Sequence, residues 1–251
     1  MEVLGMFLKK VSSFTKFYIR QAMANRITLV FTLLFPVLWT LYQGLSAHRA
    51  TQMSATHLIT ATIPFTAYII VSTALEGVAL ATMATRDSGF LKSFYFVSGS
   101  RWPMLYANML VQTGLVVLEN LVYSAFSMFL YHAFSLQLLL LVVLLTIVTF
   151  PLVSLFLTCI LLLPVRANSL SALGTSLLII LLMLFDVRTS NALLTGLAQL
   201  SPYQFIANTL RLFLGDLTLG TLGVEAVVIA IYCVVGFISY QQLNLQNRGR
   251  A

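Results

Sequence analysis

Charged side chains are scarce in this sequence. Only 8% of its 251 residues are Asp, Glu, Lys or Arg, whereas 59% are hydrophobic. A typical soluble domain carries about 25% charged residues, so the composition argues against a water-soluble fold. Because each bilayer crossing by a helix needs roughly 20 apolar residues, the length of the chain is best counted in membrane spans.

The sequence also lacks the signatures of common catalytic chemistry. It has no GxxxxGK[ST] phosphate loop, so it does not bind ATP in that way. It has no HExxH motif and no cluster of Cys and His that would hold zinc. None of its serines sits in a recognisable nucleophile setting. We therefore expect neither an enzyme nor a metal site in this chain.

Cysteine and histidine are rare, and they occupy positions that are ordinary for these residues in a membrane protein. Cys159 and Cys233 both lie inside apolar runs, where a free thiol packs as a small hydrophobe. The three histidines sit near the predicted outer edges of spans, which indicates interfacial placement: His48, His57 and His132.

Six apolar runs predict an all-α integral membrane protein with six transmembrane helices, in one transmembrane domain covering residues 1–251. The runs are about Ile27–Leu45, Leu58–Ala84, Pro103–Tyr131, Leu138–Leu163, Leu170–Phe185 and Leu222–Tyr240. Pro36 and Pro151 lie inside the first and fourth runs. Internal prolines are tolerated in spans because neighbouring helices re-satisfy the freed backbone groups.

Residues 1–24 precede the spans and predict a basic amphipathic helix that lies in the membrane surface. At 100° per residue, Lys9, Lys16 and Arg20 fall on one face, with Lys10 as an exception. A solvated leader is the alternative. The opposite face is apolar and consists of Val3, Leu4, Phe7, Leu8, Val11, Phe14 and Tyr18.

The basic residues indicate an orientation. With a cytoplasmic N-terminus, eleven of the 14 Lys and Arg residues lie on the cytoplasmic side, and only Arg49, Arg188 and Arg211 lie outside. This bias follows the positive-inside rule and places both termini in the cytoplasm of a plasma (inner) membrane protein. The net charge of +7 therefore reflects orientation, and we expect no nucleic-acid partner.

The loop between the second and third spans reads ATRDSGFLKSFYFVSGSRW and is unusually aromatic. Residues 90–98 predict a short helix that ends at Gly99 and Ser100. Its apolar arc lies against the membrane or the span ends, and Phe96 lies off this arc toward the cytoplasm. A helix that contacts only lipid is the alternative. The arc consists of Phe90, Leu91, Phe94, Tyr95 and Val97.

Two acids, Glu76 and Glu119, lie inside the second and third spans. Charge inside a membrane is costly and suggests function by default. At the helical rise, Glu76 lies roughly 13 Å from the cytoplasmic edge and Glu119 roughly 24 Å, so we expect different depths and no pairing. They either line a substrate path or form hydrogen-bonded contacts between helices.

The longest outer connection, residues 186–221, contains a further helix signal. Ser201 followed by Pro202 is typical of a helix start, and Gly215 is typical of a stop. A helix over Pro202–Leu214 is apolar enough to dip back into the outer leaflet as a packed, partly re-entrant lid. A solvated surface helix is the alternative.

The loop resembles the cytoplasmic coupling region of ABC type-2 exporter permeases. Members have a span ending in Arg, an acid, any residue and Gly, then a short helix and a small-residue turn. Here these are Arg86-Asp87-Ser88-Gly89 and Ser98-Gly99-Ser100-Arg101-Trp102, without the usual acid before Arg86 or proline in the turn. Leu200-Ser201-Pro202-Tyr203 resembles the region before the last span, and the order of the spans is similar.

The resemblance implies a permease subunit that pairs with a second permease subunit and with two cytoplasmic ABC ATPase subunits. ATP and Mg would bind those partners, and this chain would need no cofactor beyond its contact with membrane lipid. The implied sites are a substrate path at Glu76 and Glu119, an extracellular gate at Ser201, Pro202 and Tyr203, and an ATPase-coupling interface at Arg86, Asp87, Gly89, Leu91, Lys92, Phe94 and Phe96.

Two other functions remain open on the sequence. An ion-gradient-driven secondary transporter would favour inverted repeats with broken helices, and no convincing repeat relates residues 27–131 to 138–240. A membrane immunity protein would bind a peptide without pumping it. The cargo also stays open between a hydrophobic drug, a peptide and a lipid-linked molecule; the scarcity of charge in the spans favours an apolar or amphipathic one.

Overall fold

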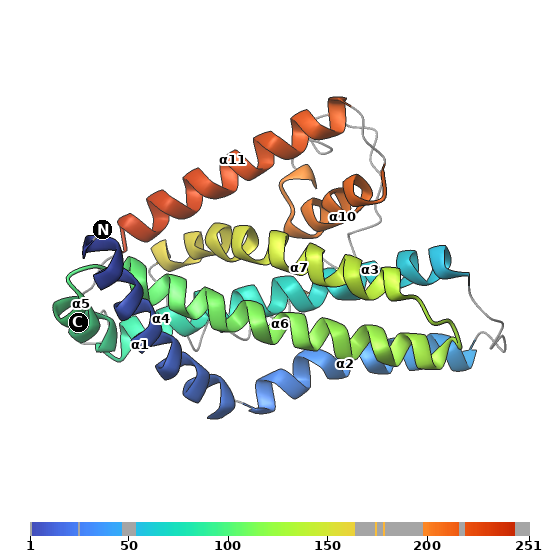
Figure 1. Ribbon diagram of the computed structural model, residues 1–251, viewed down its shortest axis with the longest axis horizontal. Coiled ribbons are helices and arrows are strands. Elements are labelled where there is room, and N and C mark those ends of the chain that lie inside the picture. The colour runs from blue at the N-terminus through green and yellow to red at the C-terminus, as the bar shows by residue number, and fades with distance from the viewer. Residues whose placement is uncertain are drawn as a thin grey trace.

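The computed structural model describes residues 2–24, 26–46, 54–163, 174, 178, 198–215 and 219–243. These residues form helices and turns, without a strand (Figure 1). In chain order the elements are α1 (Glu2–Ala24), α2 (Arg26–Ser46), α3 (Ala55–Thr73), the π-helix η1 (Ala74–Leu80), α4 (Ala81–Asp87), α5 (Phe90–Ser98), α6 (Trp102–Leu130), α7 (Leu136–Leu157), the 3-10 helix η2 (Thr158–Leu162), α10 (Pro202–Phe213) and α11 (Leu219–Gln241).

Four continuous helical segments are long and apolar enough to cross a membrane: His57–Asp87, Trp102–Leu130, Leu136–Leu162 and Gly220–Gln241. They match the second, third, fourth and sixth runs predicted from the sequence and fit a multi-pass membrane protein. The apolar part of α2 is shorter, Val30–Leu45. The run at 170–185 falls outside the described residues except for two positions, so six spans stay a prediction.

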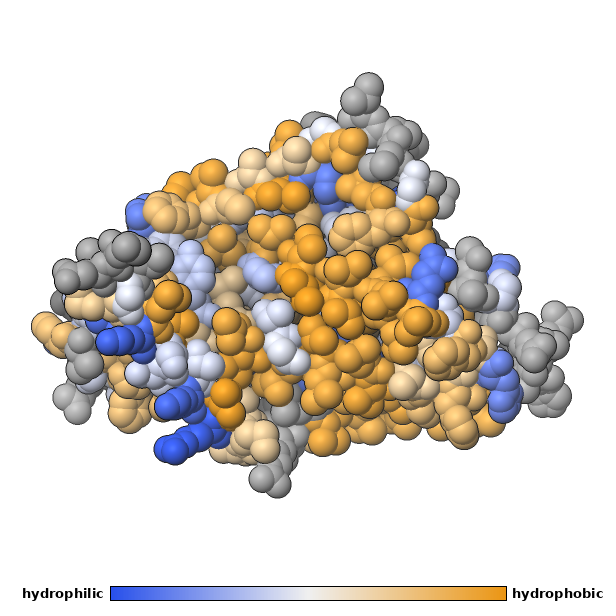
Figure 2. Space-filling view, in the orientation of Figure 1, coloured by the Kyte–Doolittle hydropathy of each residue, from blue (hydrophilic) through white to orange (hydrophobic). Residues whose placement is uncertain are grey.

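The segment from α3 to α4 is the centre of the bundle. Ile69, Ile70 and Val71 on α3 are almost completely buried, and α6, α7, α2 and α10 all contact this segment. Helix α11 packs on α7, η2 and α10 and leaves much of its apolar surface exposed. On the face in Figure 2, hydrophobic surface is continuous over the middle of the molecule and hydrophilic residues gather toward its two ends.

A π-helical turn, η1, interrupts the central segment and was not expected from the sequence. It contains Glu76 and Gly77. The amide nitrogen Nδ2 of Asn108 on α6 donates to the Gly77 carbonyl oxygen at 3.0 Å, so a side chain of the neighbouring helix satisfies a backbone group of the altered turn. Single π turns in α-helices are frequent at functional sites.

One end of the bundle brings together segments that are distant in sequence. Helices α1, α4 and α5 lie there, with the C-terminal ends of η2 and α11 and the start of α6 (Figure 1). We call this end the α5 end.

Candidate functional site

Two glycines set the limits of α5. Gly89 at its start and Gly99 after its end have φ angles of 83° and 66°, in the left-handed region that favours glycine. The helix Phe90–Ser98 between them has the bounds predicted from the sequence. A nine-residue helix therefore joins α4 to α6 at the α5 end.

The side chains of α5 divide into a packed base and a free side. Leu91 is 1% exposed, and the ring of Phe94 lies 5.4 Å from the rings of both Phe14 and Phe17 on α1, centroid to centroid. Phe96 is 73% exposed, so it does lie off the packed arc. Phe90, which the sequence placed on the same arc, is 59% exposed and stacks on Phe94 at the edge of the base, so this part of the arc does not pack against the span ends.

Lys10, the basic exception on the apolar face of α1, has a structural role. Its Nζ donates to the carbonyl oxygen of Ser98 at 2.7 Å. That carbonyl belongs to the last residue of α5, where helix carbonyls lack intrahelical partners and a cation is favourable. The position that broke the predicted amphipathic pattern therefore attaches α1 to the end of α5.

Arg86 lies inside the structure. The residue is 2% exposed. Its Nη1 donates to the Leu161 carbonyl oxygen in η2 at 3.0 Å, while Nε and Nη2 donate to Asp87 Oδ1 at the same distance. Asp87 is 25% exposed and Lys92 is exposed, whereas the buried Arg86 guanidinium fixes the end of η2 to the loop.

Arg101 makes the corresponding attachment to α11. Its Nη1 donates to the carbonyl oxygens of Gln241 at 3.0 Å and Leu243 at 2.6 Å. In return the Tyr240 hydroxyl donates to the Arg101 carbonyl oxygen at 2.9 Å. The Trp102 ring stacks on Phe237 with centroids 5.2 Å apart. The turn after α5 is thus held to the end of α11.

These contacts share one chemistry. Lys10, Arg86 and Arg101 each bind a carbonyl oxygen at or just beyond a helix C-terminus, those of α5, η2 and α11 respectively. Cations at these positions are favoured because the C-terminal carbonyls carry partial negative charge. The loop that carries Phe96 is therefore bonded to the N-terminal helix, the middle of the chain and the last helix.

The two intramembrane acids lie closer together in depth than the sequence suggested. Thr73 Oγ1 donates to Glu119 Oε2 at 3.2 Å, and Glu76 follows Thr73 by three residues, or roughly 5 Å of helical rise. The two acids therefore still differ in depth, but by less than the sequence suggested, because that comparison set the ends of the two spans level. The central segment in fact runs past the expected edge at Ala84, to Asp87.

Buried oxygen atoms without a partner among the described residues occur on α3 and α6, and one of them belongs to Glu119. Among the described residues, nine buried side chains have an oxygen without a hydrogen-bond partner, and these include Thr66 Oγ1 on α3 and Glu119 Oε1, Asn120 Oδ1 and Ser124 Oγ on α6. Asn120 uses its amide nitrogen to donate to Thr146 Oγ1 on α7 at 3.1 Å. Leaving such a group unpaired costs about 1–3 kcal/mol, so these oxygens favour a hydrogen-bond donor such as water or a polar group of a ligand.

Helix α10 is packed into the bundle. Ser201 occupies the position before it, Pro202 is its first residue and Gly215 follows it with a φ of 98°, as the sequence predicted. It ends at Phe213, one residue before the expected end. Pro202 and Tyr203 are buried, and the Tyr203 hydroxyl donates to the Leu178 carbonyl oxygen at 3.2 Å. A fully solvated surface helix is therefore excluded.

Glu225 is a buried acid that sequence reasoning missed. It is 4% exposed, and its Oε1 accepts from Thr209 Oγ1 of α10 at 2.7 Å. Its Oε2 has no partner among the described residues. The signal was present, because Glu225 falls inside the apolar run Leu222–Tyr240. The contact ties α11 to α10 at the end opposite α5.

No family model, curated protein or solved structure matches this chain. In the part of the chain that the structure describes, no group of three or more His, Cys, Asp or Glu residues is placed to hold a metal ion.

Proposed function

We propose that this chain is the transmembrane permease subunit of an ATP-driven exporter that moves an amphipathic or hydrophobic cargo out of the cell. The observation that carries the proposal is α5. It is a short helix between two apolar segments, and it presents the exposed ring of Phe96 on a base bonded to three other helices.

In this proposal a cytoplasmic ATPase subunit docks on the exposed side of α5. Phe96 enters an apolar pocket of the partner, with Asp87 and Lys92 at the rim of the contact. Large rigid side chains in desolvated pockets dominate the energy of interfaces. The partner binds and hydrolyses ATP with Mg, and two such subunits act on a pair of permease subunits in the inner membrane.

The contacts of the loop provide a path by which movement of the ATPases is transmitted to other helices. When the ATPases close, force on α5 reaches α1 through Lys10, η2 through Arg86 and α11 through Arg101. Because α11 also contacts α10 through Glu225 and Thr209, movement of α11 reaches the opposite end. Ser201, Pro202 and Tyr203 at the start of α10 then act as the extracellular gate.

The unpaired oxygens beside Glu119 form part of the cargo path in this mechanism. They accept hydrogen bonds, so a cargo with a polar group that donates is favoured over a purely hydrocarbon one. Glu76 contributes from η1, where the altered helical turn lies. The scarcity of other charge in the described apolar segments keeps the rest of the path suited to an apolar or amphipathic molecule.

The test is reconstitution. The full chain is co-expressed with candidate ABC ATPase subunits from the same genome, any complex is purified, and export is followed in inverted vesicles with candidate cargos. ATP-dependent uptake that stops when the ATPase is inactivated supports the proposal. Stable export by this chain alone, or an ATPase that never co-purifies, contradicts it.

The same vesicles test a second candidate, an ion-gradient-driven transporter. The observation in its favour is Glu119, a buried acid beside a π-helical turn with one oxygen unpaired. Intramembrane acids are common in proton relays and ion pathways. Export that continues without ATP and stops when a proton or sodium gradient is dissipated favours this candidate.

A further inference from the structure

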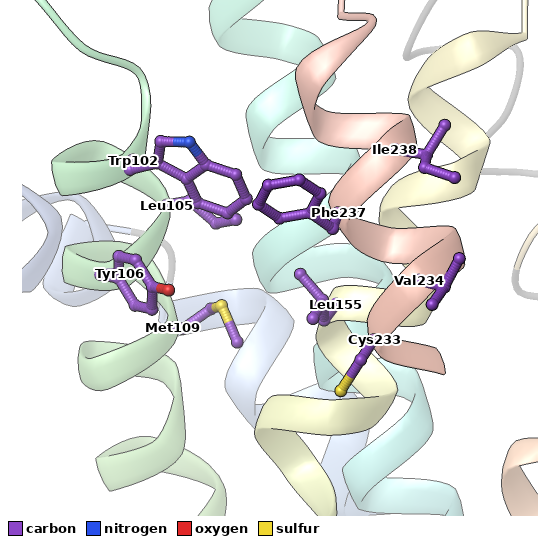
Figure 3. A pocket seen from close by; sticks show the side chains of 9 residues that line it. All are labelled: Trp102, Leu105, Tyr106, Met109, Leu155, Cys233, Val234, Phe237 and Ile238. Atoms are coloured by element: carbon purple, nitrogen blue, oxygen red, sulfur yellow. The ribbon is translucent and has the colours of Figure 1, made fainter. Parts of the chain in front are cut away.

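An apolar groove separates the start of α6 from the end of α11 (Figure 3). Its volume is about 370 Å³. Leu105, Tyr106 and Met109 on α6 face Val234 and Phe237 on α11, with Leu155 of α7 between them. Helix α11 packs closely on α7 at other positions, but no side chain among the described residues fills this groove.

The groove lies close to the ends of two helices that are long enough to span a membrane, so a molecule in it would lie near the headgroups of one leaflet. Its α6 residues lie in the first turns of that helix, and its α11 residues lie in the last turns before Gln241. Trp102 and Tyr106 line the groove at the α5 end. Trp and Tyr are enriched where a span meets the headgroup region, so a molecule in the groove would have its polar end near these rings.

A positive charge stands at that end of the groove. Arg101 precedes Trp102 and is bonded to carbonyl oxygens of Gln241 and Leu243. Among the described residues it forms no ion pair. A guanidinium without a carboxylate partner suits a phosphate group.

We propose that this groove binds an anionic phospholipid, with one acyl chain between α6 and α11 and its phosphate at Arg101. The apolar lining suits an acyl chain, the position near the helix ends suits a membrane lipid, and the guanidinium, which has no carboxylate partner among the described residues, suits an anionic headgroup. The bound lipid would hold α11 against α6 next to the attachment of α11 to the loop. The proposal does not depend on what the protein transports.

The tryptophan fluorescence of the protein itself can be used to test lipid binding in the groove. The sequence has two tryptophans, Trp39 and Trp102, and Trp102 lines the groove while Trp39 lies 42% exposed on α2. A Trp39→Phe variant leaves Trp102 as the single fluorophore, and Trp102→Phe leaves Trp39. Each full-length variant is reconstituted in vesicles in which either phosphatidylglycerol or phosphatidylcholine has brominated chains, which quench tryptophan on contact.

We expect brominated phosphatidylglycerol to quench Trp102 more strongly than brominated phosphatidylcholine at equal mole fraction, and the two lipids to quench Trp39 equally. Arg101→Gln in the Trp39→Phe background should reduce the preference at Trp102 about fivefold, the effect of roughly one basic side chain on anionic lipid binding. Arg101→Lys should keep most of it, which separates charge from loss of the contact with α11.

A matched pair on α11 tests the groove itself. Val234 lines it and is 56% exposed, whereas Val227, two turns earlier and 59% exposed, does not line it. Val234→Phe should lower quenching of Trp102 by both lipids, and Val227→Phe should not. The phenylalanine takes the space that the acyl chain needs, without adding fluorescence that interferes.

Three results would overturn the proposal. Equal quenching of Trp102 by the two lipids would mean that the groove holds bulk lipid without selecting charge. Absence of quenching would mean that protein, including a second copy, covers it. If a variant fails to fold, the test is mass spectrometry of the wild-type protein released from micelles. Equal retention of phosphatidylglycerol and phosphatidylcholine would contradict an anionic site.

Discussion

The Lys10 ammonium lies 2.7 Å from the carbonyl oxygen of Ser98, so the N-terminal helix closes the end of the short helix that carries Phe96. The two residues are 88 positions apart in the sequence. The relationship makes α1 part of the α5 platform, and it explains why a lysine interrupts an otherwise apolar face.

Replacing Lys10 should loosen α5. A cation at a helix C-terminus contributes about 0.3–1 kcal/mol, so Lys10→Gln should speed hydrogen exchange of the α5 amides about two- to fivefold. Lys9→Gln is the control, because Lys9 is exposed next to it and has the same charge. Equal exchange in the two variants, measured by mass spectrometry in detergent, would remove Lys10 from this role.

Phe96→Ala should weaken binding of the partner ATPase at least tenfold, the order of one hot-spot residue, while the chain inserts and folds normally. Phe134→Ala is a suitable control because Phe134 is 82% exposed and lies in the turn between α6 and α7, away from α5. Co-purification of the ATPase and ATP-dependent transport are the measurements. If both variants behave like the wild type, Phe96 is not the docking residue.

A charge at position 94 should act differently from one at position 96. Phe94 packs between Phe14 and Phe17 of α1, so Phe94→Asp should separate α1 from α5 and lower the thermal stability as well as transport. Phe96→Asp should leave the melting temperature within about 2 °C, since surface substitutions change stability little, and affect transport alone. Unchanged stability in Phe94→Asp would show that the aromatic base is dispensable.

Glu119→Gln should alter transport more than folding. The glutamine keeps an oxygen for the hydroxyl of Thr73 and nearly the same volume, while it removes the acid from the oxygen-lined interior. We expect a change in cargo preference or rate of at least fivefold, with a melting temperature close to that of the wild type. Normal export combined with a large loss of stability would assign Glu119 a purely structural role.

The packing at the π turn predicts a specific steric effect. A Cβ at Gly77 would lie 2.7 Å from the side-chain amide of Gln112, whereas a Cβ at Gly114 would have no heavy atom within 4 Å. Gly77→Ala should therefore destabilise by about 1–3 kcal/mol, as overpacking does, and Gly114→Ala should stabilise by up to about 1 kcal/mol.

Adding Gln112→Ala to Gly77→Ala should restore part of the lost stability by removing the colliding amide. The stability of all three variants is measured by thermal unfolding in detergent, which is followed through the loss of burial of the native cysteines. If Gly77→Ala alone is as stable as the wild type, the Gln112 side chain moves aside freely and the contact does not constrain η1.

Local rules in the sequence were enough for several parts of the structure. The apolar runs marked the four long helical segments, because the length of a span follows from the thickness of the hydrocarbon layer. Gly99 marked the end of α5, and Ser201 with Pro202 marked the start of α10. These features depend on residues that are neighbours in the chain, so composition and spacing reveal them.

The rest depended on which helix faces which. Arg86 and Leu161 are 75 positions apart, and Arg101 and Leu243 are 142 apart, so no local pattern shows that these cations close distant helix ends. The relative depth of Glu76 and Glu119 likewise depends on how far each helix extends past the membrane edge. The Gly77 carbonyl in the π turn accepts from Asn108 of α6, a contact that no local pattern shows.

The sequence by itself therefore determined that this is a helical chain with long apolar segments and an aromatic helix between two of them. Only the tertiary structure decided that Phe94 packs on Phe14 and Phe17 of α1, that the loop is bonded to both α1 and α11, and that Glu225 of α11 is tied to Thr209 of α10. Helix formation follows from hydrogen bonds along one segment, whereas these features follow from contacts between segments that the chain brings together only when it packs.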